Sequence, residues 1–249
     1  MKVTVVGCSG SMPGPESAAS CYLVEHDGFR LVLDMGHGSL GSLQRFAEVP
    51  DIDAVAVTHL HADHWIDLTA LYVALRYGPY GISRRLPVFG PDATADRMAD
   101  AYGMPRSPGT HATFDFRSLP LTSVIGPFRV RTARMNHPVE AYAIRLDADG
   151  QSLVYSGDTG RCSELTDLAS GADLLVAEAS CVDGQDNPPD LHLTGKEAGE
   201  AAATARVPHL VITHVPPWNS GETALTEARS IFDGRTTLAA PGLVIDLAR

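Results

Sequence analysis

One short segment restricts what this chain can be more than any other: residues 58–64, which read Thr-His-Leu-His-Ala-Asp-His and follow an apolar run of Ala and Val. Imidazole and carboxylate are the groups that borderline cations such as Zn²⁺ prefer. At a strand end His59 and His61 point the same way, because side chains alternate along a strand. Asp63 and His64 lie on the turn into the next helix and can face a second point. The segment predicts the start of two neighbouring metal sites; a single structural zinc, or a histidine cluster without metal, is the alternative.

Size, composition and charge limit the class of protein. The chain has 249 residues, 44% of them hydrophobic, which is enough for one sizeable core, so we expect a single domain over 1–249. No apolar run reaches the length of a membrane span, and residues 1–7 read as a strand and turn rather than a signal peptide. We therefore expect a cytoplasmic protein with no membrane partner. The formal net charge of −11 disfavours long nucleic acid as a partner and is compatible with a small anion.

Strand and helix patterns alternate along the chain. Strands are predicted at 2–6, 21–25, 30–34, 54–58, 86–89, 128–133, 141–146, 152–156, 174–177, 210–213 and 242–246. Helices are predicted at 40–46, 65–77, 93–102, 162–169, 195–205 and 223–232. Runs of strands with single helices between them favour packed sheets with helices outside.

Further ligand-type residues follow other predicted strands. His137, Asp158 and His214 each come directly after an apolar strand, as His59 does. Strand ends at one edge of a sheet converge in space, which is where open α/β sheets place their sites. Taken alone, either histidine would more often be structural, and Asp158 lies in a Ser-Gly-Asp-Thr-Gly sequence that suits a turn. Their joint occurrence favours metal ligation, with Asp158 as the carboxylate that can bridge two cations.

The order of these residues resembles the metallo-β-lactamase superfamily in its two-metal hydrolase form. Residues 7–11 and 33–36 resemble the first hairpin and the Asp-x-Gly loop of that family, so the resemblance covers nearly the whole chain. It implies an α/β fold, an αββα sandwich of two mixed β-sheets flanked by helices. It also implies the ligands of two divalent metal ions: His59, His61 and His137 for one, Asp63, His64 and His214 for the other, and Asp158 with a hydroxide between them. Zinc is the expected metal, although Mn²⁺ or Fe²⁺ suits the same ligands. By the same resemblance Asp34 would orient a ligand; a turn-forming role is its alternative.

A histidine ahead of a predicted helix distinguishes the branches of this superfamily. His192 precedes Thr194 and Glu197, which form a capping-box pair, so it lies just before a helix N-terminus, where anions are stabilised. There it can meet a phosphate and protonate a leaving oxygen. The segment resembles the His-x-Thr motif of tRNase Z-like phosphodiesterases, which implies that His192, together with Asp63, is catalytic. A loop histidine in a capping turn is the alternative.

Charge and spacing refine the expected substrate. Two divalent cations, less two aspartates and one hydroxide, leave one positive charge, which favours a phosphodiester anion and its transition state. tRNase Z enzymes carry a tRNA-gripping arm between the third histidine and the bridging aspartate, but His137 and Asp158 are only 21 residues apart. The segment 215–219 also departs from the tRNase pattern. The chain is therefore more similar to compact actinobacterial-type relatives with cyclic-nucleotide phosphodiesterase activity.

The leading prediction is a dinuclear phosphodiesterase that hydrolyses a small phosphodiester, above all a cyclic nucleotide, by attack of the bridging hydroxide with His192 assisting the leaving group. tRNA 3′-processing and thioester or lactone hydrolysis are the alternatives. β-Lactamase action is disfavoured by the absence of an export signal and by the bridging aspartate. A non-catalytic scaffold is disfavoured because all seven ligand positions are filled. Trp65 or Trp218 could stack on a base, although a core or lid aromatic is the commoner role, and the resemblance allows a homodimer.

Overall fold

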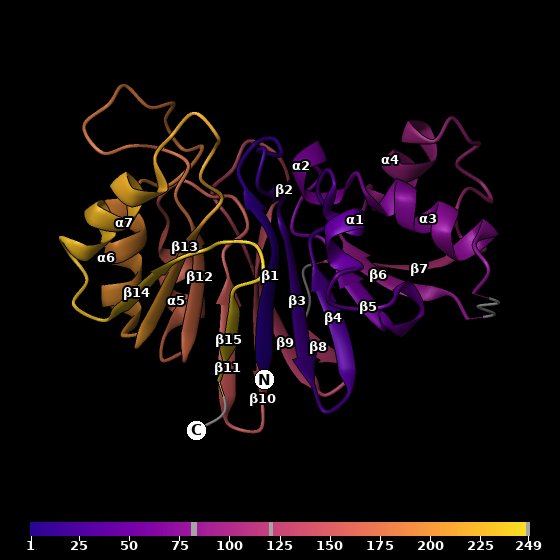
Figure 1. Ribbon diagram of the computed structural model, residues 1–249, viewed down its shortest axis with the longest axis horizontal. Helices are drawn as coiled ribbons and strands as arrows, with labels where there is room; N and C mark the ends of the chain where they lie inside the picture. Colours follow the sequence, from indigo (N-terminus) through magenta and orange to yellow (C-terminus); the bar gives the residue numbers. More distant parts are fainter. Residues whose placement is uncertain (81–83, 120–121, 248–249) are drawn as a thin grey trace.

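The computed structural model describes residues 1–80, 84–119 and 122–247. Its strands form two mixed β-sheets that lie face to face, and helices cover the outer side of each sheet (Figure 1). The predicted fold class, an αββα sandwich, is therefore confirmed. No helix in the described part of the chain is long and apolar enough to cross a membrane.

The first sheet has the strand order β15-β1-β3-β4-β5-β6-β7, with β2 beside β1. Strands β15, β1, β3 and β4 pair antiparallel, whereas β4, β5, β6 and β7 pair parallel. The strand bounds are β1 (Lys2–Ser9), β2 (Ala18–Ala19), β3 (Cys21–His26), β4 (Phe29–Leu33), β5 (Ala54–Ala56), β6 (Leu86–Gly90), β7 (Phe114–Ser118) and β15 (Val244–Asp246). The parallel half brings the carboxyl ends of its strands to one edge.

The second sheet repeats this division, with the order β14-β13-β12-β11-β10-β9-β8. Strands β11 to β14 pair parallel and strands β8 to β11 pair antiparallel. The strand bounds are β8 (Thr122–Ile125), β9 (Phe128–Arg134), β10 (Tyr142–Ala148), β11 (Gln151–Tyr155), β12 (Leu174–Glu178), β13 (His209–Thr213) and β14 (Arg235–Leu238). Its parallel half also directs carboxyl ends to a single edge.

Three apolar layers hold the sandwich together. Neighbouring side chains of β1 point to opposite faces, so Val5 joins the layer between the sheets and Val6 joins the layer under the helices. The central layer also takes Tyr22 from the first sheet and Val176 from the second. Each fully buried side chain of this kind contributes roughly 1.5–3 kcal/mol relative to an exposed one.

The helices divide between the two outer faces. The first sheet is covered by α1 (Ser39–Leu43), α2 (Ala62–Trp65), α3 (Leu68–Tyr77) and α4 (Thr94–Ala101), with a 3₁₀ turn at Val49–Asp51. The second sheet is covered by α5 (Ser163–Ala169), α6 (Gly195–Ala205) and α7 (Gly221–Arg229). Small residues of α6 face α7 closely, because a Cβ at Gly195 would meet the Ala224 carbonyl.

The helix predicted at 65–77 is wrong in its first part. The chain forms two helices, α2 and α3, with a break at Ile66 and Asp67. The break gives Asp67 two tertiary hydrogen bonds: its backbone N–H donates to the Met35 carbonyl at 3.0 Å, and its carboxylate accepts from the Leu40 N–H at 2.9 Å. These bonds fasten the loop after β4 to the segment that carries Asp63 and His64.

Four strands were not predicted from the sequence, and three of them lie at a sheet edge. Strands β7, β8 and β14 end the two sheets, where one side of each strand meets solvent. None of the three has a continuous apolar run: their sequences are Phe-Asp-Phe-Arg-Ser, Thr-Ser-Val-Ile and Arg-Thr-Thr-Leu. The fourth, β2, is only two residues long.

Candidate metal centre

The sequence-predicted ligands lie at the edge where the two sheets direct their carboxyl ends. His59 follows β5, Asp158 follows β11 and His214 follows β13. His137 comes from the loop between β9 and β10, and the 59–64 segment continues into α2. The strands are fixed by the buried sheets, so the side chains that follow them are held in position by the fold.

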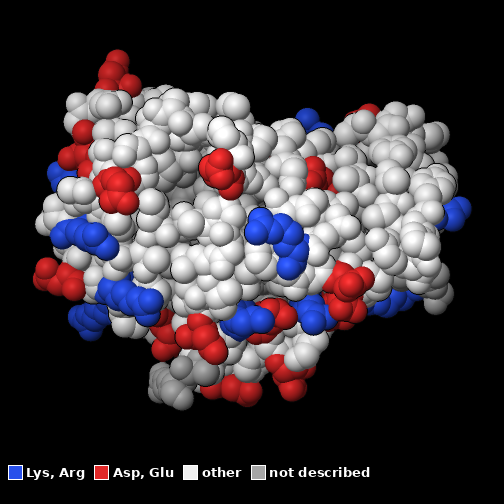
Figure 2. All heavy atoms as spheres, viewed as in Figure 1, with Lys and Arg blue, Asp and Glu red and all other residues white. Residues whose placement is uncertain are grey.

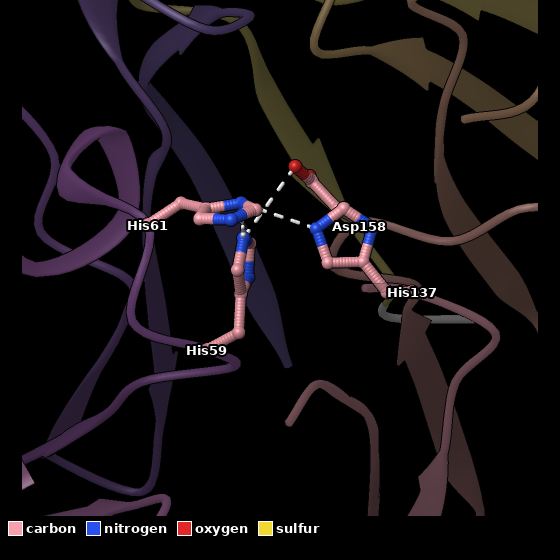
Figure 3. Close-up of side chains that lie close together, drawn as sticks. All are labelled: His59, His61, His137 and Asp158. Carbon is pink, nitrogen blue, oxygen red and sulfur yellow. Dashed lines mark hydrogen bonds and ion pairs between the residues drawn. The ribbon is translucent and has the colours of Figure 1, made fainter. Parts of the chain in front are cut away.

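A first group of candidate ligands is His59, His61, His137 and Asp158, whose ligand-type atoms all lie within 4.8 Å of one another. Figure 3 shows the three imidazoles and the carboxylate turned toward a common point. His61 Nδ1 lies 3.2 Å from His59 Nε2 and 3.1 Å from His137 Nε2. His59 Nε2 lies 3.5 Å from Asp158 Oδ2.

A second group is Asp63, His64, Asp158 and His214, again within 4.8 Å of one another. His214 Nε2 lies 3.1 Å from both His64 Nε2 and Asp63 Oδ2, and His64 Nε2 lies 3.2 Å from Asp158 Oδ1. Asp158 belongs to both groups. The structure therefore brings all seven predicted ligand residues together, with the predicted bridging carboxylate between the two sets.

The hydrogen bonds around His64 and His214 fix where their ring protons lie. His64 Nδ1 faces the Asp34 carboxylate at 2.7 Å and must donate to it. Ser180 Oγ donates its single proton to the His214 carbonyl at 2.7 Å, so it accepts from His214 Nδ1 at 2.8 Å. In the neutral rings both Nε2 atoms then carry lone pairs, and these face each other at 3.1 Å. Two facing lone pairs need a positive charge between or beside them.

The first group has the same arrangement. Thr58 Oγ1 donates to Asp34 at 2.9 Å and so accepts from His59 Nδ1 at 3.1 Å. His137 Nδ1 donates to the Leu191 carbonyl at 3.0 Å. The Nε2 atoms of His59 and His137 are therefore lone-pair donors directed inward. Metal-binding histidines commonly donate the N–H of the outer ring nitrogen to an acceptor in this way, and the residues present fit divalent cations.

Burial and neighbouring charges together set the protonation of the candidate ligands. Burial lowers the pKa of His59, His61 and His137, which keeps these imidazoles neutral and able to bind a metal. Burial disfavours the charged form of Asp158, but neighbouring histidines hold the pKa of that carboxyl well below its usual range. Asp158 Oδ1 is also completely buried without a hydrogen-bond partner. A buried carboxylate oxygen of this kind calls for a cation.

Asp34 lies at the centre of the hydrogen-bond network behind these ligands. Its side chain is completely buried and accepts from the Thr58 N–H at 2.7 Å, from the Tyr155 hydroxyl at 2.8 Å and from His64. Its backbone is left-handed, with φ 57°, a conformation that costs energy for a residue with a side chain. The expected position of Asp34, in contact with a candidate ligand, is what the structure shows.

His214 also has a left-handed backbone, with φ 57°. The end of β1 packs directly against it, because the His214 N–H donates to the Cys8 carbonyl at 3.0 Å. A Cβ at Gly10 would collide with the His214 carbonyl, so only glycine fits there. Sequence reasoning placed Gly10 in the first hairpin but did not connect it to His214.

His192 lies beside the two groups. Its ring centre is 5.6 Å from that of His214 and 5.7 Å from that of His137. The predicted capping box is present: Thr194 and Glu197 exchange hydrogen bonds at the start of α6. The histidine is thus held next to the candidate metal positions by the turn into this helix.

Glu178 is the residue that the sequence analysis missed. Its completely buried carboxylate accepts a hydrogen bond from His192 Nδ1 at 2.8 Å and from the Thr159 N–H at 2.8 Å, and its other oxygen accepts from the Ser180 N–H at 3.1 Å. Burial disfavours the imidazolium, but the charge and the hydrogen bond of Glu178 raise the pKa of His192 to about 9. The sequence signal that could have identified Glu178 is its position as an acidic residue at the end of the apolar strand 174–178.

Comparison with known proteins identifies the family. The β-lactamase superfamily domain matches residues 30–215. A Mycobacterium leprae protein of uncharacterised function is 43% identical over 99% of this chain and 89% of its own length. YhfI of Bacillus subtilis, a probable metallo-hydrolase, is 30% identical over 98% of this chain and 99% of its own.

Solved structures agree with the sequence comparison. The crystal structure of YhfI, a metallo-β-lactamase fold protein, superposes with a TM-score of 0.89 and covers 98% of both chains. Human tRNase Z, short form, superposes with a TM-score of 0.79 at 22% identity over 100% of both chains, a likeness of fold. The domain match and the extent of the shared sequence show that this chain belongs to the metallo-β-lactamase branch of the β-lactamase superfamily and has the metal-dependent hydrolase fold of that family.

Proposed function

We propose that this protein is a dinuclear metal-dependent phosphodiesterase whose leading substrate class is the cyclic nucleotides. The observation that carries the proposal is the pairing of His192 with the buried Glu178, 2.8 Å apart, beside two ligand groups that share Asp158. A hydrolase of thioesters or lactones needs no such acid next to its metals. A phosphodiesterase needs a proton for the departing oxygen.

Two divalent cations are assigned to the two ligand groups. His59, His61 and His137 would hold one, Asp63, His64 and His214 would hold the other, and Asp158 would contact both. Zinc is the first choice, and Mn²⁺ or Fe²⁺ would suit the same donors. When bound, the pair neutralises phosphoryl oxygens and makes water nucleophilic near neutral pH.

Asp63 is assigned the orientation of the attacking water. Burial disfavours its charged form, but the neighbouring His214 and His64 hold the pKa of this carboxyl below its usual range, so it is ionised at neutral pH. Its Oδ2 lies 3.1 Å from His214 Nε2, inside the second ligand group. A carboxylate in that position can accept a hydrogen bond from water and orient it.

We assign to His192 the donation of a proton to the departing oxygen of the substrate. Glu178 holds Nδ1–H, so Nε2–H is free to face a substrate oxygen. The raised pKa of His192, about 9, keeps the imidazole protonated at neutral pH. As the leaving oxygen departs in line with the attacking water, it takes the proton from His192 Nε2 and becomes an alcohol. Glu178 keeps its hydrogen bond to the ring during this step.

Two observations support a small substrate rather than tRNA. Between His137 and Asp158 the chain, described throughout this stretch, forms only the β10–β11 hairpin with its turn at 149–150. On the face shown in Figure 2, Lys and Arg side chains are interspersed with Asp and Glu instead of forming one broad basic surface. A folded RNA would have no arm to grip it here, although the likeness to tRNase Z keeps tRNA 3′-processing as the second candidate.

The test uses metal-reconstituted protein whose metal content has been measured. Wild type and His192→Ala are assayed on bis(p-nitrophenyl) phosphate, on 2′,3′- and 3′,5′-cyclic nucleotides, and on a pre-tRNA with a 3′ trailer. We expect turnover of the small diesters that falls about 100-fold or more in His192→Ala, since general acid catalysis commonly contributes that much. The matched control is His26→Ala, because His26 also pairs with a carboxylate, Asp149, at 2.9 Å but lies away from the centre. A fully metallated protein that cleaves thioesters or lactones and no phosphodiester would overturn the proposal.

A further inference from the structure

The two tryptophans of this chain lie in opposite environments. Trp65 is only 4% exposed, and its indole N–H donates to the Leu60 carbonyl at 3.2 Å. Trp218 is 65% exposed. Trp65 is therefore a core residue behind the 59–64 segment, whereas the large apolar face of Trp218 is open to solvent. An exposed indole is a strong stacking surface when something flat can reach it.

A turn that contains two prolines connects Trp218 to His214, a candidate metal ligand. Trp218 follows His214 by four residues, and two prolines, Pro216 and Pro217, fix the backbone between them. The next residue, Asn219, donates its backbone N–H to the Pro216 carbonyl at 2.9 Å and its side-chain amide to the Ser180 carbonyl at 2.7 Å. Ser180 is also the residue that bonds His214 Nδ1. The turn that carries the indole is thus anchored to the same residue that orients a candidate ligand.

A second exposed apolar side chain stands on the neighbouring loop. Met12 is 48% exposed, and its carbonyl accepts a hydrogen bond from Ser9 Oγ at 2.6 Å. This loop packs on the Trp218 turn, because the Gly10 N–H donates to the Val215 carbonyl at 3.2 Å and Ser9 forms a β-bridge with Val215. In Figure 1 the segment between β13 and α7 lies at the upper edge of the molecule, where α2 also lies. Two exposed apolar side chains therefore stand on adjoining loops that both contact the His214 segment.

We propose that Trp218, assisted by Met12, is the platform on which the flat heteroaromatic base of a nucleotide substrate stacks while its phosphodiester occupies the metal centre. This inference rests on the proposed phosphodiesterase function and specifies its substrate class: diesters that carry a base, rather than base-free phosphodiesters. Stacking uses the π-face that every base has, so discrimination among bases should be weak and purines should bind somewhat better than pyrimidines. The fixed diproline turn means that little conformational freedom is lost on binding.

The first test follows the fluorescence of the indole. Trp65→Phe leaves Trp218 as the single tryptophan, because the chain has two. The metal-loaded variant is titrated with adenosine 5′-monophosphate and, separately, with ribose 5-phosphate. We expect saturable quenching by the nucleotide and none by the sugar phosphate. Equal responses to both ligands, or no response to the nucleotide, would overturn the proposal.

The same measurement on Trp218→Phe avoids reliance on a core substitution. This variant keeps the buried Trp65, so the nucleotide-dependent quenching seen in wild type should disappear. Quenching that survives in Trp218→Phe would place the base elsewhere and would contradict the platform.

The second test is kinetic. We expect Trp218→Ala to lower kcat/KM for a 2′,3′-cyclic nucleotide, relative to that for base-free methyl riboside 2,3-cyclic phosphate, by about 10- to 100-fold, chiefly through KM. Trp218→Phe should restore most of the ratio. The control is Tyr77→Ala, since Tyr77 is equally exposed, at 67%, but lies on α3. An unchanged ratio in Trp218→Ala would refute the stacking role of Trp218 without contradicting the phosphodiesterase function. A wild-type protein that is inactive on both diesters would refute the phosphodiesterase function, and the fluorescence titration would then decide whether a base binds at Trp218.

Discussion

His192 Nδ1 lies 2.8 Å from Glu178 Oε1, and the carboxylate of this pair has no exposed surface. Glu178 ends β12, and its second oxygen holds the Ser180 N–H, so one side chain links the histidine to the residue that positions His214. A buried carboxylate next to an imidazole fixes the tautomer of the ring and favours its protonated form. The proton-donating group and the metal ligands are thus parts of one connected network.

The first prediction concerns the pH dependence of turnover. Glu178→Gln should keep an acceptor for His192 Nδ1 but remove the negative charge that raises the pKa of His192 to about 9. The pKa then falls toward the ordinary histidine value near 6.5. A general acid works in its protonated form, so the alkaline limb of the kcat/KM profile should move to lower pH. We expect a loss of about 10- to 100-fold at pH 8.5 and a much smaller loss at pH 6.

The control for this shift is Glu140→Gln. Glu140 accepts a hydrogen bond from the Tyr142 hydroxyl at 2.8 Å and does not contact His192. Its profile should overlay that of wild type. An equal loss at every pH in Glu178→Gln would mean that Glu178 only supports the fold.

The second prediction concerns Asp34. Asp34→Asn should weaken metal binding by about 10- to 100-fold, because the carboxylate that fixes the His64 ring is replaced by an amide, and supporting residues of this kind commonly contribute that much. The measurement is competition with a chelator of known affinity, followed by metal content per chain. Asp53→Asn is the matched control, since Asp53 accepts from a backbone N–H, that of Arg30, at 2.9 Å, away from the centre. Unaltered affinity in Asp34→Asn would assign Asp34 to the fold alone.

The candidate ligands were accessible from the sequence because each follows an apolar strand. His59, Asp158 and His214 could be found one at a time, and the two-sheet architecture places their strand ends at one edge. Glu178 also ends an apolar strand, but its role could not be derived from that position. It stands alone at the end of its strand, and its importance comes from a contact with a histidine 14 residues away, across a loop that the sequence does not specify.

The fold shows the same limit. Strands buried on both faces, such as β12 with its sequence Leu-Leu-Val-Ala-Glu, have a continuous apolar pattern that predicts them directly. Edge strand β14, Arg-Thr-Thr-Leu, has none and exists because β13 offers it backbone partners. The break between α2 and α3 likewise depends on tertiary bonds of Asp67 and not on a local helix-ending residue. Local sequence patterns therefore predict the buried strands. Edge strands and helix breaks depend on tertiary hydrogen bonds, which a local pattern does not contain.

The third prediction uses the contact between Gly10 and His214. In Gly10→Ala the new methyl group would collide with the His214 carbonyl and displace this ligand. We expect the content of bound metal to fall from two ions per chain toward one, with the remaining ion at the group built from His59, His61 and His137. The measurement is elemental analysis after dialysis. The control is Gly41→Ala, where the added methyl meets open space in α1. Two retained ions in Gly10→Ala would show that His214 does not hold the second.

The fourth prediction concerns removal of the cations. A metal-free protein should be less stable than the loaded one, and the difference should be larger at pH 8 than at pH 5.5. Without cations, burial disfavours a charge on His64, but Asp158 and Asp34 raise its pKa well above the usual value. The stabilising contribution of protonated His64 is fully present below the unfolded pKa of about 6.5 and is lost as pH rises through the folded pKa. At low pH the proton therefore replaces part of the missing positive charge.

Differential scanning fluorimetry with and without Zn²⁺ measures this difference. At pH 8, with free metal about 1,000-fold above Kd, linkage contributes about 4 kcal/mol, which raises Tm by about 8–16 °C in a chain of this size. At pH 5.5 the increase should be several degrees smaller, since protons compete for the imidazoles of the metal-free state. Mg²⁺ is the control, because it prefers oxygen ligands and should give little change at either pH. An increase with Zn²⁺ that is the same at both pH values would show that protonation of His64 does not compensate for the missing cation, and no increase at either pH would count against the metal centre itself.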